Sequence, residues 1–200
     1  MNNDSRERMV QAASELFLGG SFHKIGIAEI CSVAHVNKGT FYHFFPSKIS
    51  LLLEIIDRYT GAVAEQFSNV AKSALPPAKK VSGVFDVPQE RNTAWQAEYG
   101  SASGCFIGNI ILEMAATDPV VRERAEKAIE RLTRTLQPIV DEYLRSLKVE
   151  GADVPAIAEL LMGMIQGAQV QAKVHNDPAV FSRYAACAPS MLHAAVAVPA

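Results

Sequence analysis

Apolar residues recur at helical spacing along most of the 200-residue chain, and no segment shows the strict alternation typical of a half-buried strand. A first helix is predicted from Asp4 or Ser5, either of which can cap it, to about Leu18, before a Gly-Gly pair ends it. A long amphipathic helix is predicted over 48–73, where apolar side chains return every three or four positions. The hydrophobic pattern of these segments therefore predicts helices and indicates an all-α protein.

The C-terminal part of the chain continues in the same way. Two prolines after Leu75 break the long helix, and Pro88 lies within 78–99, which predicts two short helices or one kinked helix there. The sequence GSASG at 100–104 is typical of a loop. Further helices are predicted at 105–116, 119–147, 154–175 and about 179–194.

The segment 25–48 has the spacing of a helix-turn-helix. Apolar residues predict one helix over about 27–34, and His35 then falls in a tight turn, where a positive φ is usual and His is better tolerated than most residues. Asn37 is a good N-cap for a second short helix over about 38–44. That helix carries hydroxyls and cations and no acid, a chemistry that fits a DNA groove.

The sequence KGTFYHFFPSK, which begins at Lys38, resembles the DNA-binding signature of the TetR family of transcriptional regulators. The preceding IAEICSVAHVN is similar to that family's IAxxAGVS pattern, with His35 in place of the usual turn glycine and Asn37 in place of the usual serine cap. The resemblance implies a three-helix helix-turn-helix domain at 1–47 and a helical effector-binding and dimerisation domain at 48–200. It also implies DNA contacts from Lys38, Thr40, Tyr42, His43 and Lys48.

Charge supports a specific DNA binder over a nonspecific one. The net charge is −2, and residues 1–48 hold five Lys or Arg against four acids. A small basic surface on a nearly neutral body suits sequence-specific contact. Thr40 and Tyr42 can reach base edges and phosphates, whereas the three cationic side chains of the signature can neutralise phosphates. The alternative is that the aromatic residues of this helix only fill a small core.

Several other classes find no support in the sequence. No apolar run is long enough to span a bilayer, and the N-terminus does not have the pattern of a signal peptide. The three cysteines are widely spaced and fit neither a disulfide framework nor a zinc site. We find no catalytic triad, phosphate loop or metal-binding motif. The chain is therefore expected to be cytoplasmic, without a cofactor or a metal, and not an enzyme.

A second motif begins at Gly104 and reads GCFIGNIILEMAATDP. It resembles a GCxxGNxxxE motif of one TetR branch, which includes the NemR-like sensors of electrophiles and oxidants. Cys105 lies near a predicted helix N-terminus, which favours the thiolate form that electrophiles attack, and Asn109 and Glu113 share its helix face. As a sensor, Cys105 should react before Cys31 and Cys187. The alternative is that Cys105 is a small buried hydrophobe.

A polar stripe, formed by Met162, Gln166, Gln169 and Lys173, runs along an otherwise apolar helix. It could line an effector cavity, with Lys173 pairing with Glu113 or stabilising the Cys105 thiolate, or it could be the solvated face of the helix. Trp95 and Tyr99 could wall an apolar pocket. The predicted effector-binding set is therefore Trp95, Tyr99, Cys105, Asn109, Glu113, Gln166, Gln169 and Lys173.

These features together predict a transcriptional regulator, usually a repressor in this family. It should bind a palindromic DNA operator as a homodimer through its last two helices and leave the operator when a small molecule or an electrophile binds. Two alternatives remain. One is a thiol switch at Cys105 without a stored ligand, and the other is an architectural or activating DNA-binding protein without an effector. A small-molecule sensor predicts a sizeable cavity between the fourth and eighth helices, and a thiol switch predicts an accessible Cys105 that faces a cation. An architectural protein predicts a packed domain with neither.

Overall fold

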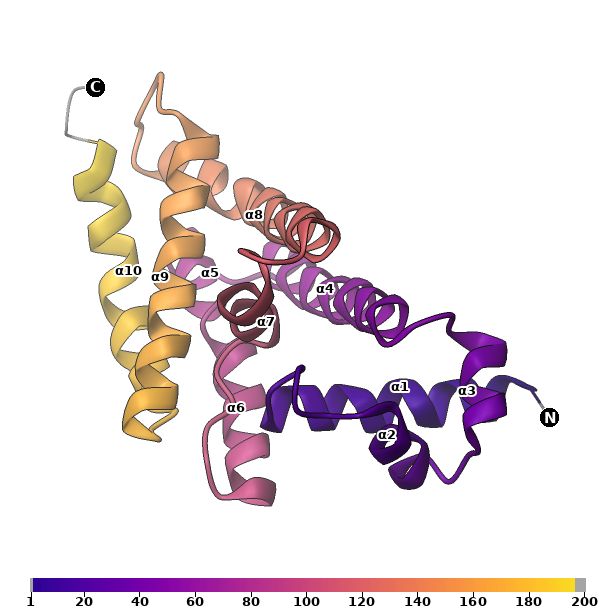
Figure 1. Cartoon of the computed structure of the whole chain (residues 1–200). Helices are drawn as coiled ribbons and strands as arrows, with labels where there is room; N and C mark the ends of the chain where they lie inside the picture. Colours follow the sequence, from indigo (N-terminus) through magenta and orange to yellow (C-terminus); the bar gives the residue numbers. More distant parts are fainter. Residues whose placement is uncertain (1, 197–200) are drawn as a thin grey trace. The chain divides into compact units, whose positions relative to one another are not determined.

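The computed structural model describes residues 2–196 (Figure 1). Every regular element in this range is helical, so the predicted all-α fold is confirmed. The helices are α1 (Asn2–Gly19), α2 (Ile27–Val33), α3 (Lys38–Phe44), α4 (Lys48–Lys72), α5 (Pro77–Gly83), α6 (Asp86–Tyr99), α7 (Phe106–Met114), α8 (Pro119–Ser146), α9 (Val154–His175) and α10 (Val180–Val196).

The first compact unit comprises the chain up to Tyr59 together with residues 106–128. It holds α1 to α3, the first half of α4, α7 and the start of α8, so the predicted DNA-binding segment 1–47 lies entirely within it. Ion pairs join its elements. Arg58 of α4 bonds both Glu54 on its own helix and Glu7 of α1, and Arg124 of α8 pairs with Asp57 of α4.

The helix-turn-helix has the geometry that the sequence predicts. His35 takes a left-handed backbone with φ 51°, and the Val36 N–H donates to the Cys31 carbonyl at 2.9 Å, which closes the turn after α2. Asn37 caps α3, because its side-chain oxygen accepts from the Thr40 N–H at 2.8 Å. Ile30 and Phe41 are fully buried and hold the two helices on the unit's core.

The second unit comprises residues 60–105 and the chain from Ile129 onward. It holds the rest of α4 and α8 together with α5, α6, α9 and α10, and α9 lies alongside α10 (Figure 1). Its core includes Leu161, Phe181 and Leu192, all fully buried. The hydroxyl of Tyr143 on α8 donates to the Pro189 carbonyl of α10 at 2.7 Å, so a hydrogen bond joins these two helices.

The segment 78–99 forms two helices and not one kinked helix, which confirms the first of the two predicted alternatives. Pro88 is the third residue of α6, in the first turn, where a missing backbone N–H breaks no helical hydrogen bond. The helix predicted to begin at Cys105 begins one residue later, at Phe106, and Cys105 belongs to the preceding loop.

Candidate nucleic-acid interface and effector site

The outer face of α3 carries the predicted DNA-contacting side chains. Lys38, Tyr42 and His43 are exposed, and Tyr42 is 55% exposed although its ring meets the buried Phe41 ring edge-on at 5.4 Å. A large aromatic side chain held outward by a fixed backbone is suited to contact a groove. Thr40 is half-buried on the first turn of the same helix.

Lys48 is placed differently from these residues. Its ammonium donates to the carbonyls of Phe22 and Ile25 at 2.7 and 2.8 Å, and it lies 4.1 Å from the centroid of the Phe22 ring. Burial lowers the pKa of Lys48, and the Glu113 carboxylate partly opposes that change. Two of the three N–H groups of this ammonium are therefore used inside the first unit, which leaves one for a phosphate.

Glu113, predicted as an effector-binding residue, contacts the loop between α1 and α2. Its carboxylate accepts from the Ser21 hydroxyl at 2.5 Å and from the N–H groups of Phe22 and His23, both at 3.0 Å. Burial raises the pKa of Glu113, but the hydrogen bonds from Ser21, His23 and Phe22 together lower it below its ordinary value. Both oxygens of the carboxylate thus accept hydrogen bonds from other residues of the first unit.

Residues 102–105 of the loop before α7 are buried, and hydrogen bonds hold this loop within the second unit. The side chain of Asn92 on α6 accepts from the Gly104 N–H at 2.8 Å, and the side chain of Asn176 accepts from the Ala102 N–H at 2.7 Å. Gly104 has a φ of 72°, which strains any other residue, and a Cβ there would lie 3.1 Å from Cδ of Lys173, so that side chain would have to shift. Cys105, which follows, is only 6% exposed.

Sequence reasoning did not identify Asn92 and Asn176 as anchors of this loop. Asn176 ends α9 in a left-handed conformation with φ 49°, and it also donates to the Gly100 carbonyl at 3.1 Å. Its place before Asp-Pro predicted only the end of a helix. Asn92 had no sequence signal, because its partners lie eleven and twelve residues away across a loop.

Asn109 is half-buried on α7 in the first unit, whereas the remaining predicted effector residues are spread over the second unit. Trp95 and Tyr99 stack at 4.0 Å between ring centroids on α6, with Trp95 half-buried and Tyr99 exposed, so they do not enclose a buried pocket. On α9, Gln169 is buried and Lys173 is exposed. The polar stripe is therefore not simply a solvated face.

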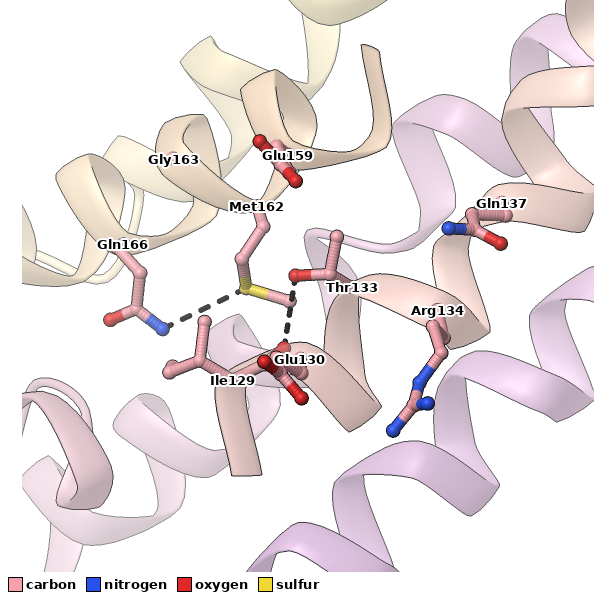
Figure 2. A pocket seen from close by; sticks show the side chains of 9 residues that line it. All are labelled: Ile129, Glu130, Thr133, Arg134, Gln137, Glu159, Met162, Gly163 and Gln166. Carbon is pink, nitrogen blue, oxygen red and sulfur yellow. Dashed lines mark hydrogen bonds between the residues drawn. The ribbon is translucent and has the colours of Figure 1, made fainter. Parts of the chain in front are cut away.

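A groove of about 530 Å³ lies between α8 and α9 (Figure 2). Met162 points into it, and the Gln166 amide lies 3.9 Å from the Met162 sulfur. Of the predicted effector set, only Gln166 lines this groove. The lining residues are Ile129, Glu130, Thr133, Arg134, Gln137, Glu159, Met162, Gly163 and Gln166.

Among residues 2–196, no group of three or more His, Cys, Asp or Glu side chains is arranged to hold a metal ion. No helix in the same range combines the length and the apolar character that a membrane span requires.

A helical chain with a capped, outward-facing second helix in a helix-turn-helix defines a DNA-binding transcriptional regulator. The family described as "Bacterial regulatory proteins, tetR family" matches residues 9–55, and the family described as "Tetracyclin repressor-like, C-terminal domain" matches residues 89–188. The chain therefore belongs to the TetR family, as the sequence motifs indicated. It is a transcriptional regulator and not an enzyme.

Individual relatives agree with this assignment. The chain is 23% identical to the HTH-type transcriptional repressor DhaR of Mycobacterium sp. strain GP1 over 174 residues, which are 86% of this chain and 84% of that protein. The structure of Escherichia coli NemR in its reduced form matches with a TM-score of 0.78 at 20% identity, over 92% of this chain and 94% of NemR. That of FadR from Bacillus subtilis in complex with stearoyl-CoA matches with a TM-score of 0.72 at 17% identity, over 93% and 96%.

Proposed function

We propose that the chain is a cytoplasmic repressor that binds a palindromic operator as a homodimer and leaves it when a small molecule binds. Residues 1–47 serve as the DNA-binding domain and 48–200 as the effector-binding and dimerisation domain. The observation that carries this proposal is the exposed face of α3, where Lys38, Tyr42 and His43 project from a capped helix. No acid lies on that helix to repel phosphate.

The individual contacts follow from chemistry and exposure. Tyr42 offers a ring and a hydroxyl to a groove, while Lys38 and His43 can lie against phosphates. Thr40 stands at the first turn of α3, from which base edges are reached in helix-turn-helix proteins. Lys48 acts mainly inside the unit, through the carbonyls of Phe22 and Ile25, and can offer its remaining N–H to a phosphate.

Dimerisation through α9 and α10 is supported by the side chains that these helices leave uncovered. Leu160, Val170 and Val174 are exposed on α9, and Met191 is exposed on α10. Exposed apolar side chains at helical spacing are typical of a helix–helix interface. Leu161, the residue after Leu160 on α9, is fully buried and packs within its own subunit, so it lies outside the uncovered face.

The effector is proposed to be a small molecule. The groove between α8 and α9 has a volume within the usual range for ligand sites, and Met162 and Gln166 give it a soft apolar wall and a hydrogen-bonding amide. FadR from Bacillus subtilis, which has the same fold, forms a complex with stearoyl-CoA. An architectural protein would need no groove. A thiol switch would need an accessible Cys105, and that residue is buried.

The test begins with DNA. Random duplexes are enriched on the purified chain, and an inverted repeat with half-sites about one helical turn apart is expected. Recovery of no common sequence would overturn the proposal. Small molecules that release this operator are then compared on the parent and on Gln166→Trp, which fills the groove. Release that is unchanged in the variant would place the effector elsewhere.

A further inference from the structure

We infer that Glu113 is a positioning residue for DNA binding. Its carboxylate fixes the loop between α1 and α2 and so sets the position from which the helix-turn-helix contacts the operator. This inference rests on the proposed function, because a change of position matters only if two subunits bind two half-sites. It gives the motif residue a role that differs from effector binding.

The first observation is the completeness of the contact. One oxygen of Glu113 accepts from the Ser21 hydroxyl and the His23 N–H, and the other accepts from the Phe22 N–H. Three consecutive residues of the loop thus share one carboxylate, which lies 90 to 92 positions away in the chain. Hydrogen bonds to an ionised acceptor are about twice as strong as neutral ones.

The second observation is that the ammonium group of Lys48, on another helix, donates hydrogen bonds to the same loop. Lys48, the first residue of α4, donates to the carbonyls of Phe22 and Ile25 and lies over the Phe22 ring. Phe22 itself is buried against Phe17 of α1, at 5.1 Å between ring centroids. N–H groups of the loop therefore donate to Glu113 of α7, and carbonyl groups of the loop accept from Lys48 of α4. Helix α2 begins directly after the loop.

The third observation is the course of the chain. Helix α4 continues into the second unit after Tyr59, and the loop of the second unit that ends at Cys105 leads directly into α7. The segment before α7 is fastened in that unit by Asn92 and Asn176. A displacement of this segment is therefore carried by the covalent chain to α7 and to Glu113. The coupling needs no direct contact between an effector and the DNA-binding helices.

A role in stability alone would leave a different signature. If Glu113 only held the first unit together, its loss would weaken binding to every operator by the same factor, through the population of folded protein. A positioning residue changes the relative affinities for operators whose half-sites lie at different separations, because each separation demands a different placement of α3. The preferred spacing is therefore the informative quantity.

The experiment measures dissociation constants of the full-length chain on palindromes whose half-site spacing is the selected one, one base pair shorter, or one or two longer. The variants are Glu113→Ala and Glu113→Gln, whose amide can replace only one of the two oxygens as acceptor. Ser21→Ala removes a single donor and serves if Glu113→Ala does not fold. The matched control is Glu123→Gln, which removes the same charge from an exposed ion pair with Lys127 in the same unit.

We expect Glu113→Ala to reduce the preference for the selected spacing roughly fivefold or more, the usual lower range of coupling between sites. Glu113→Gln and Ser21→Ala should change it in the same direction by less, and Glu123→Gln should not change it. An unaltered preference in folded Glu113 and Ser21 variants would overturn the inference and leave Glu113 a purely structural role. Failure of the parent to bind any palindrome as a dimer would instead overturn the proposed function.

Discussion

The side-chain oxygen of Asn37 accepts two hydrogen bonds from Thr40, one from its N–H at 2.8 Å and one from its hydroxyl at 3.1 Å. The cap of α3 thereby also fixes the hydroxyl of a residue predicted to contact DNA. Because that hydroxyl donates its proton to Asn37, it can only accept a hydrogen bond from the operator. Thr40 is therefore suited to a base amino group or, through its methyl group, to thymine, and not to a phosphate.

Replacing Asn37 with Ala should destabilise the chain by about 1 kcal/mol, because the first turn of α3 loses its cap. Operator affinity should fall further, since the Thr40 hydroxyl is then free to rotate. Urea unfolding and fluorescence anisotropy on the selected operator measure the two effects. Asn37→Ser, which keeps a capping oxygen, is the control and should retain most of the stability. Equal stability of the alanine variant and the parent would refute the role of the cap.

Lys48 and Lys38 should respond oppositely to removal of their charge. Lys48→Met should lower stability by about 1–3 kcal/mol, because two carbonyls lose a charged donor in a half-buried place. Lys38→Met should leave stability within about 0.5 kcal/mol, since its side chain is exposed. If it contacts a phosphate, the slope of log affinity against log salt should become shallower by about 0.9.

Thermal unfolding and salt titrations of operator binding separate these two lysines. The sequence predicts that Lys48 can neutralise a phosphate. A Lys48→Met variant with normal stability and a shallower salt slope would restore that interpretation and contradict the present one.

The Glu113 contact should make stability depend on pH in a defined direction. Its pKa in the folded chain is lowered, with burial opposed by the hydrogen bonds from Ser21, His23 and Phe22. The ionised carboxylate therefore stabilises the fold above the ordinary pKa near 4.5, and that contribution is lost as the pH falls through the lower folded value. The stability difference between the parent and Glu113→Gln, from urea unfolding, should shrink from pH 7 to pH 3. A difference that grows on acidification would show the sign to be wrong.

The order in which the cysteines are labelled should follow their burial and not the motif that contains Cys105. Cys31 and Cys105 are buried, burial raises the pKa of Cys31, and Cys187 is exposed on α10. N-ethylmaleimide should therefore modify Cys187 first, as peptide mass analysis would show. If α10 lies in the dimer interface, Leu160→Asp should yield monomers and faster labelling of Cys187. Labelling of Cys105 ahead of Cys187 would instead support an electrophile sensor.

Local features were predictable from sequence because their causes are local. The positive φ of His35 and the cap at Asn37 each depend on neighbours within four residues. The break after Leu75 and the start of α8 after Asp118 follow from the same short-range chemistry of proline and carboxylate.

Long-range placement could not be predicted in the same way. The face of α7 that bears Glu113 was identified, but periodicity does not say which element that face meets, and the partner is the loop of Ser21 to His23. On α9, one helical residue is a rotation of about 100°. That rotation separates the exposed Leu160 from the buried Leu161, which an apolar run cannot distinguish.

The central claim is that α3 binds a specific DNA sequence, and Tyr42→Ala tests it most directly. Dissociation constants are measured by anisotropy, at one fixed salt concentration, for the selected palindrome and for a scrambled duplex of equal composition. Because Tyr42 is exposed, its loss should leave the unfolding curve unchanged. We predict that affinity for the palindrome falls by about 1–3 kcal/mol while affinity for the scrambled duplex changes little. Equal affinities of the variant and the parent for the palindrome would contradict the claim.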